Sequence, residues 1–192
     1  GGVSSAVHES QSRLWENVVG RSLPFWRWFY PRLQETFPEK FGSVPLRAFH
    51  QAVNQPLRSF IRVDADETSY GLHVILRFEL EQELVSGRLA IADLPDAWNT
   101  RFHELLGLEV RDDRQGVLQD SHWSTGYFGY FPTYLLGSVL SVQVWDRAKQ
   151  AIPDVDEQME RGDFSELHAW LHENVYALGS KYTPAETIER VV

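Results

Sequence analysis

The sequence predicts a mainly α-helical fold with one small β element near residues 59–64. Apolar residues recur at spacings of three and four along most of the chain, which is the periodicity of helices with one buried face. Only residues 59–64 alternate with a period of two, as a strand does. We find no repeat and no clear linker, and 192 residues that are 43% hydrophobic can bury a core. We therefore expect one mostly α-helical body.

The first part of the chain is predicted to form helices on both sides of a loop. Residues 9–22 carry an apolar stripe at helical spacing, and Pro24 permits a kink or a new helix start. The segment 24–37 is so aromatic that we expect it to pack deeply. Residues 38–45 are expected to form a loop because of their proline and glycine content, and residues 46–54 a short amphipathic helix.

The predicted strand leads directly into a long helix. In the segment 59–64, Ile61 and Val63 would share one face of a sheet. Asp64 and Glu67 have the spacing of a capping box, and a long apolar-periodic run follows them. We therefore expect a strand whose end marks the start of a helix.

Helices and one long loop account for the rest of the chain. Residues 91–107 predict a helix with proline in its first turn and glycine at its end. Residues 108–132 are irregular and rich in Gly and Asp, and a loop of this length is usually functional. Further helices are expected at residues 133–152, 154–162, 164–180 and 183–191.

Composition and charge argue against several classes of function. The net charge is −9, which would repel polyanions, so we expect no nucleic-acid partner. The sequence has no cysteine, so a metal would need His, Asp or Glu ligands. No apolar run approaches the roughly 20 residues of a membrane span, and nothing resembles a signal peptide. We expect no membrane partner, a cytoplasmic location and, because the only methionine is Met159, a processed or truncated chain.

The histidines do not complete the helix motif of a zinc protease. His168 and His172 have the i, i+4 spacing, but Ala169 stands where the motif requires Glu. The His-Glu pairs that begin at His103 and His172 also fail, because Gly107 and Tyr176 stand in place of the second His. We interpret His168 and His172 as partly exposed helix residues. No serine lies in a Gly-x-Ser-x-Gly elbow, so a nucleophilic triad is equally weak.

Three short stretches carry the strongest functional signal when they are taken together. They are HESQ at 8–11, IRVDAD at 61–66 and GVLQDSHW at 116–123. Their order and company closely resemble the carboxypeptidase Taq family of zinc metallocarboxypeptidases, whose three corresponding motifs are matched here without a substitution. The resemblance covers essentially the whole chain. It implies that residues 1–192 are the C-terminal part of a single helical, zincin-like metallopeptidase catalytic domain.

The resemblance also implies an activity and a metal. The activity is release of C-terminal residues from peptides with broad specificity by a homodimeric enzyme that uses zinc, or cobalt or another divalent metal in its place. In the family, two His of a His-Glu-x-x-His helix and the Glu of the His-Glu-Ser motif hold the metal, and that Glu maps to Glu9. The paired histidines are not found in this sequence. We therefore expect this chain alone to bind zinc poorly and to be inactive.

Residues beside Glu9 are expected to support it. Metal ligands are oriented by hydrogen-bonded neighbours, and this favours His8 or Gln11 in that role. For Ser10, Gln11 and Arg13 the alternative interpretation is helix capping and a surface charge.

Arg62 is the implied anchor for the substrate. An exopeptidase must recognise a chain end, and a guanidinium can hold the terminal carboxylate with two parallel hydrogen bonds. A structural ion pair of Arg62 with Asp64 or Asp66 is an equally good interpretation of the sequence.

The long loop supplies the remaining implied site residues. Related zinc peptidases place a His and one or more Tyr over the scissile carbonyl, where they can stabilise a developing oxyanion. The catalytic residues implied here are His122 first, then Tyr134 and Tyr130, and the residues implied in substrate binding are Arg62, Gln119, Asp120 and Tyr127. Loop capping is the alternative for Gln119 and Asp120. His73 and Arg77 could line the cleft, but a buried helix His is as plausible.

Two other functions stay open at this point. A related zinc oligopeptidase shares the His-plus-Tyr segment and would cleave within a peptide. A non-catalytic helical interaction module would instead use the aromatic surface to bind a protein. The three motif matches argue against the first, whereas the missing zinc helix keeps the second open.

Overall fold

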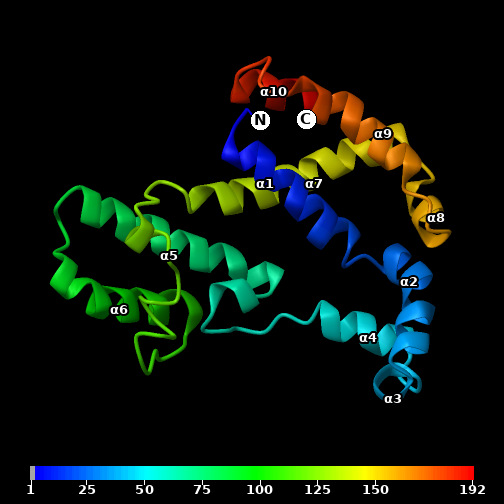
Figure 1. Ribbon diagram of the computed structural model, residues 1–192. Coiled ribbons are helices and arrows are strands. Elements are labelled where there is room, and N and C mark those ends of the chain that lie inside the picture. Colours follow the sequence, from blue (N-terminus) through cyan, green and yellow to red (C-terminus); the bar gives the residue numbers. More distant parts are fainter. Residues whose placement is uncertain (1–2) are drawn as a thin grey trace. The chain divides into compact units, whose positions relative to one another are not determined.

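The computed structural model describes residues 3–192, and it confirms the mainly helical fold (Figure 1). No strand is present within these residues. The chain divides into two compact units, one made of the described residues up to Asn54 together with Leu136–Val192, and the other of Gln55–Leu135. The single catalytic domain over residues 1–192 stays a prediction.

Helices make up nearly all of the first unit. In chain order it contains α1 (Ser5–Arg13), a π-helical segment (Leu14–Val19), α2 (Leu23–Thr36), α3 (Pro38–Phe41), α4 (Leu46–Val53), α7 (Pro132–Ala151) from Leu136 onward, α8 (Val155–Glu160), α9 (Ser165–Asn174), a 3₁₀ turn (Tyr176–Leu178) and α10 (Pro184–Val191). Side-chain caps mark several of the starts. Ser4 accepts a hydrogen bond from the Val7 amide at α1, and Thr183 forms a capping box with Glu186 at α10.

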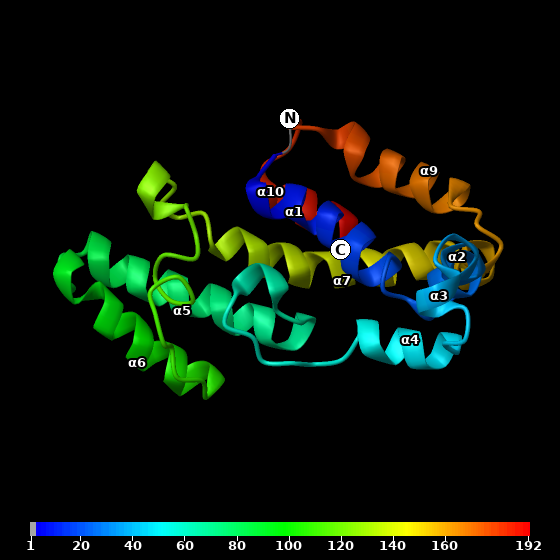
Figure 2. The same cartoon turned by 60° about the horizontal axis from the view of Figure 1, so that its bottom comes forward.

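The core of the first unit is apolar. Leu14, Met159 and Leu171 are fully buried in it, and the aliphatic residues of α7 and α10 complete the cluster. Figure 2 shows α2, α3 and α4 lying together within this unit. The core follows from the apolar stripes that the sequence places on these helices.

The aromatic segment around α2 packs less deeply than the sequence predicts. Only Tyr30 is buried in this helix, and its other rings are partly exposed. They contact one another and α4 instead, as in the pairs of Phe49 with Trp26 at 4.5 Å and with Tyr30 at 4.7 Å between ring centroids. The prediction of a loop at 38–45 was partly wrong. Pro38 occupies a first helical position and begins the short helix α3.

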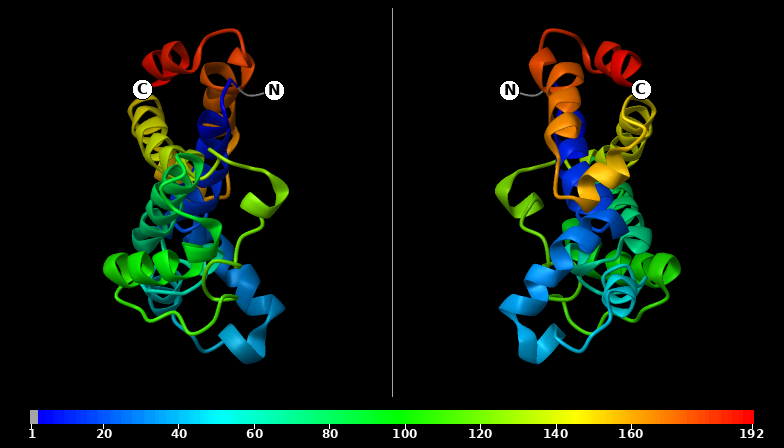
Figure 3. Two further views of the ribbon diagram at one scale, coloured as in Figure 1. Left: turned by 90° about the vertical axis from the view of Figure 1, so that its left-hand side faces the viewer. Right: turned by 90° about the vertical axis from the view of Figure 1, so that its right-hand side faces the viewer.

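The second unit is built on two neighbouring helices and the long loop. These are α5 (Glu67–Val85) and α6 (Leu94–Leu106), which lie side by side in Figures 1 and 3 and pack against each other. Short 3₁₀ turns occur at Arg62–Asp64, Ile91–Asp93 and Trp123–Thr125. Leu76, Trp98 and Phe102 form the centre of one core cluster, while Phe131 joins a second. As predicted, Gly107 ends α6 in the left-handed conformation, with φ +67°.

The small β element predicted near residues 59–64 was wrong. Arg62–Asp64 forms a 3₁₀ turn, in which Arg62 is buried and Val63 is 71% exposed, the reverse of the pattern expected of a strand. The backbone N–H of Arg62 donates to Oε1 of Gln119 rather than to a neighbouring strand. The alternation in the sequence arises because Arg62 stands between Ile61 and Val63. Hydrophobicity alone therefore predicted that the aliphatic side chains would be buried, whereas the Arg62 guanidinium is.

The start of α5 also differs by two residues from the prediction. Asp66, not Asp64, is the cap, and its Oδ1 accepts from the amides of Thr68 at 2.7 Å and Ser69 at 3.0 Å. Burial alone would raise the pKa of Asp66, but hydrogen bonds from the Ser69 hydroxyl and from these amides lower it. No helix in the described part of the chain is both long enough and apolar enough to cross a membrane.

Candidate functional site

A buried ionic cluster in the second unit brings two of the three sequence motifs together. Asp120 lies between two arginines, accepting from Arg62 Nη2 at 2.7 Å and from Arg77 Nε at 2.6 Å. Arg62 comes from the 3₁₀ turn, Arg77 from α5 and Asp120 from the end of the long loop. The acidic partner of Arg62 is thus Asp120, 58 residues away in sequence, and not Asp64 or Asp66, the ion pair that the sequence left open.

Gln119 fixes the loop against the turn that carries Arg62. Its Oε1 accepts from the Arg62 amide at 2.8 Å, and its Nε2 donates to the carbonyl oxygens of Phe60 and Gln115, both at 2.9 Å. One amide side chain thus joins residues 60 and 62 to the loop. The Gln119 side chain therefore fixes the backbone of the turn that carries Arg62.

The electrostatics of the cluster favour full ionisation with an excess positive charge. Burial alone would raise the pKa of Asp120, but the hydrogen bonds and charges of Arg62 and Arg77 outweigh it and lower that pKa. Burial lowers the pKa of Arg77 to about 10, while Asp120 keeps the pKa of Arg62 raised despite burial. Two guanidiniums therefore face one carboxylate at neutral pH.

Aromatic rings surround the Arg62 guanidinium. Its Nη1 donates to the Tyr70 hydroxyl at 3.0 Å, and its central carbon lies 4.9 Å from the Tyr134 ring centre and 5.8 Å from that of Phe131. Rings at these distances attract a cation and exclude water from it. Asp120 and Tyr70 occupy three of the five N–H groups of Arg62, which leaves two for another acceptor.

His122 lies at the edge of the same cluster. Its Nε2 is 2.9 Å from the Tyr134 hydroxyl, and its Nδ1 is 3.8 Å from Asp120 Oδ1. Burial lowers the pKa of His122, and the charges of Arg62 and Arg77 act in the same direction, whereas Asp120 opposes them. The imidazole is therefore neutral at pH 7 and can donate one N–H.

The three tyrosines of the long loop and the start of α7 differ in their placement. Tyr134 bonds His122, and the Tyr130 ring centre lies 5.9 Å from the His122 ring. Tyr127 is 60% exposed and contacts Tyr130 with ring centres 6.1 Å apart. Of the three, Tyr134 is the one joined directly to both His122 and Arg62.

Two further titratable side chains are buried in this unit, and the sequence missed one of them. His73 is fully buried against Phe102, where burial and then the charge of Arg77 lower its pKa to about 4. Glu81 is 6% exposed and accepts hydrogen bonds from Trp123 Nε1 at 2.8 Å and from the Gly129 amide. Glu81 lies seven residues after Val74 and four after Arg77, and this helical spacing could have placed it on the buried face of α5.

Glu9, the implied metal ligand, lies on α1 in the first unit. Its Oε1 accepts from Arg13 Nε at 3.0 Å, one helical turn away. Gln11 donates to Ser10 Oγ at 3.0 Å, and His8 is exposed and lines a cavity of about 600 Å³ with Trp15. The support of Glu9 by His8 or Gln11 stays a prediction.

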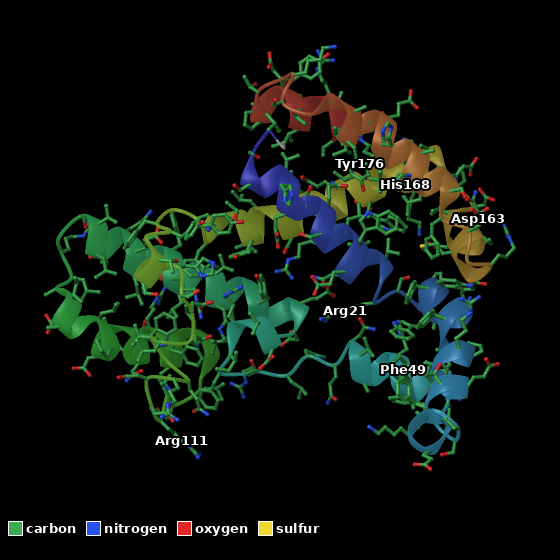
Figure 4. All side chains as sticks on the ribbon, viewed as in Figure 1. Arg21, Phe49, Arg111, Asp163, His168 and Tyr176 are labelled. Carbon is green, nitrogen blue, oxygen red and sulfur yellow. The ribbon has the colours of Figure 1, made fainter. Side chains whose placement is uncertain are left out.

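The described residues do not form a zinc site by themselves. No group of three or more His, Asp or Glu side chains within residues 3–192 could hold a metal ion. Glu9 alone falls short of the three protein ligands of a catalytic zinc site. His168 lies exposed on α9 near Tyr176, with ring centroids 6.1 Å apart (Figure 4). His172 is also exposed, and its ring centroid is 6.5 Å from that of Tyr176.

Comparisons with known proteins agree on one family. The family model described as carboxypeptidase Taq (M32) metallopeptidase matches residues 1–192. Thermostable carboxypeptidase 1 of Thermus thermophilus is 46% identical over 189 residues, which are 98% of this chain and 37% of that protein. Carboxypeptidase 1 of Bacillus subtilis is 40% identical, over 98% of this chain and 38% of that protein.

Solved structures give the same result. The M32 carboxypeptidase from Deinococcus radiodurans R1 matches with a TM-score of 0.95 and 50% identity, over 100% of this chain and 39% of that one. A carboxypeptidase structure from Pyrococcus furiosus matches with a TM-score of 0.96 and 41% identity, over 100% of this chain and 38% of that one. The chain thus spans somewhat over a third of the length of these relatives.

Proposed function

The chain belongs to the carboxypeptidase Taq (M32) metallopeptidase family, and on this basis we propose that it forms part of a zinc carboxypeptidase that removes C-terminal residues from peptides with broad specificity. The observation that carries the proposal is the cluster of Arg62, Asp120, His122 and Tyr134, which joins two motifs in one buried arrangement. The cytoplasmic location and the homodimer of the whole enzyme belong to the same proposal.

In this proposal the ionic cluster recognises the end of the substrate. Two guanidiniums and one carboxylate leave one positive charge, which a terminal carboxylate would neutralise. Arg62 keeps two N–H groups for this acceptor, and Asp120 holds the guanidinium plane in place. Arg77 is fully buried, so it contributes charge and support to Asp120 rather than contact.

His122 and Tyr134 would act on the scissile carbonyl. The neutral imidazole and the phenol are hydrogen-bonded to each other, so one proton donor is oriented by the other. Donors that are already in place stabilise the charge that develops on a carbonyl oxygen during hydrolysis. Tyr130 and Tyr127 would line the approach to this pair, because the Tyr130 ring lies against the His122 ring and the Tyr127 ring lies against Tyr130.

Glu9 would contribute one carboxylate to the metal, and the other ligands would have to come from residues other than these 192. Zinc, or cobalt or another divalent ion in its place, supplies Lewis acidity and an activated water when bound in such a site. A chain with this single ligand is expected to bind zinc poorly and to be inactive alone.

The test uses an active enzyme that contains this chain, with a short N-acylated peptide and its C-terminal amide as substrates. Arg62→Ala should lower kcat/KM for the free acid by about 10- to 150-fold, which corresponds to the roughly 1.5–3 kcal/mol of hydrogen bonds to a charged group. The preference for acid over amide should disappear with it. Arg101→Ala, which breaks a more exposed pair with Glu79, should change neither.

Three outcomes decide between the functions. Unchanged discrimination in Arg62→Ala would contradict the substrate-anchoring role of Arg62. Efficient internal cleavage of a peptide blocked at its C-terminus would instead indicate an oligopeptidase. Hydrolysis that survives removal of metal by a chelator would contradict the metallopeptidase.

A further inference from the structure

The loop that carries His122 and Tyr130 contains one 3₁₀ turn, Trp123–Thr125, and the Tyr127 amide donates to the His122 carbonyl at 2.8 Å. Ser124 to Gly129 are exposed, including Tyr127 and Phe128 at 60% and 50%. Gly126 and Gly129 have φ of +82° and +75°, and a Cβ added to either would meet nothing within 4 Å. These internal bonds do not include the amide of Gly129, so the position of Gly129 depends on a contact from outside the turn.

Glu81 makes that connection from α5. One carboxylate oxygen accepts from the Trp123 indole at 2.8 Å, and the other accepts from the Gly129 amide. The two donors lie 42 and 48 residues away in sequence, at the start and end of the exposed segment. Trp123 is in turn packed against Trp98 and Phe131, with ring centres 6.3 and 5.9 Å away.

The chemistry of this contact is unusual for a structural residue. Glu81 is 6% exposed, and both of its hydrogen-bond donors are neutral N–H groups. A buried carboxylate without a cationic partner is costly, and stability alone would be served better by an apolar residue. The arrangement therefore points to a requirement for two acceptor atoms at this place.

We propose that Glu81 is a positioning residue that staples the two ends of the loop, so that His122 and Tyr130 are held in the orientation that the site needs. The role of the loop in catalysis rests on the proposed function, whereas the contacts of Glu81 with the loop do not depend on it. The carboxylate suits the task because it offers two acceptors to two donors. A glutamine offers one acceptor and would set its NH₂ group against the second donor, and an aspartate is one carbon shorter.

The charge of Glu81 also reaches the histidine. It raises the pKa of His122, as Asp120 does, whereas burial, Arg62 and Arg77 lower it. Substitution of Glu81 by glutamine should therefore lower the pKa of His122 further. This change reports the charge of Glu81, whereas the signals of Trp123 and Gly129 report its positioning of the loop.

The decisive experiment compares Glu81→Gln with Glu83→Gln in this chain by ¹H–¹⁵N NMR. Glu83 lies on the same helix and pairs with exposed Arg88, so it provides a matched control. Glu81→Gln should move the Trp123 indole and Gly129 amide signals, speed hydrogen exchange at Gly129 at least tenfold and lower the pKa of His122. The control should leave all three unchanged.

Two further arms keep the proposal falsifiable. If Glu81→Gln does not fold, Trp123→Phe removes one donor while keeping the ring, and it should release the same loop amides. In an active enzyme containing the chain, Glu81→Gln should lower kcat by about 10- to 100-fold, the usual cost of losing an orienting partner, with little change in KM.

Unchanged loop signals in Glu81→Gln, or equal changes in Glu83→Gln, would overturn the proposal. Absence of carboxypeptidase activity in the unmodified enzyme would contradict the proposed function and leave the NMR result standing.

Discussion

The two units bury different kinds of polar group. In the described part of the first unit the buried polar side chains are neutral, namely Ser10, Ser141, Gln158 and Thr187. In the second unit they include four titratable side chains, Arg62, His73, Arg77 and Glu81. Neutral hydroxyls are satisfied within their own helix, as in the bond from Ser10 Oγ to the Val7 carbonyl at 2.7 Å. In the second unit Arg62, Arg77 and Glu81 instead bond to partners far apart in sequence, while both ring nitrogens of His73 have no hydrogen-bond partner among the described residues.

This difference separates an apolar core from a core that contains the proposed site. A buried ion pair contributes little net stability compared with apolar residues of the same volume, because desolvation opposes the attraction. The same pair becomes essential once it is built, since removal of one partner leaves a charge buried. The second unit should therefore be sensitive to single charge changes and to pH, whereas sterics should dominate in the first.

The largest expected effect comes from Asp120→Asn. This nearly isosteric change removes the one carboxylate shared by Arg62 and Arg77, and it should lower the free energy of unfolding by about 3–5 kcal/mol. Urea denaturation followed by circular dichroism measures this change. Asp156→Asn, which breaks the more exposed pair with Lys149, should cost less than about 1 kcal/mol. Equal costs in the two variants would remove the distinction between the units.

A smaller effect is expected from the protonation of His73. Its folded pKa of about 4 lies below the ordinary value of 6.5, so between these pH values the unfolded chain binds more protons than the folded one. Stability should therefore be fully present above pH 6.5 and fall as the pH drops toward 4, by up to roughly 3 kcal/mol.

The pH dependence can be assigned to His73 by substitution. In His73→Gln the fall between pH 6.5 and 4 should be reduced, whatever the stability of the variant at pH 7. His103→Gln removes an exposed histidine of the same unit and should leave the fall unchanged. A parallel loss in all three proteins would show that other groups control the acid response.

Much of the fold was predictable because it depends on local signals. Helical periodicity located most of the helices, and Gly107 marked the end of α6 through a conformation that glycine adopts readily. The long loop at residues 108–132 was likewise visible from its composition. By contrast, the turn at Arg62 was missed because its face is decided by Asp120, a partner that no local pattern reveals.

The sequence indicated which residues could form the candidate site but not how they are arranged. The motifs contain Arg62, Asp120 and His122, the resemblance adds Tyr134, and these four side chains lie together in the second unit. Glu81 was missed because acidic residues stand on either side of it, at Glu79 and Glu83, and all three look alike in sequence. Only the buried spacing along α5 separates Glu81 from its neighbours.

The smallest effect should come from Gly137→Ala in the first unit, where sterics decide. A Cβ at this position of α7 would lie 2.7 Å from Glu9 Cγ and 2.8 Å from Glu9 Cβ, closer than packed carbons approach. Overpacking typically costs about 1–3 kcal/mol, while alanine in place of a helix-interior glycine returns up to about 1 kcal/mol. A net destabilisation of about 0–2 kcal/mol should follow, and Glu9, the proposed metal ligand, should be displaced.

Gly71→Ala in α5 is the matched control because its Cβ meets only a movable methyl of Leu135 at 3.2 Å, and it should be neutral or stabilising. Thermal unfolding of both variants measures the difference, and a Gly137→Ala protein as stable as Gly71→Ala would show that α1 yields freely at Glu9.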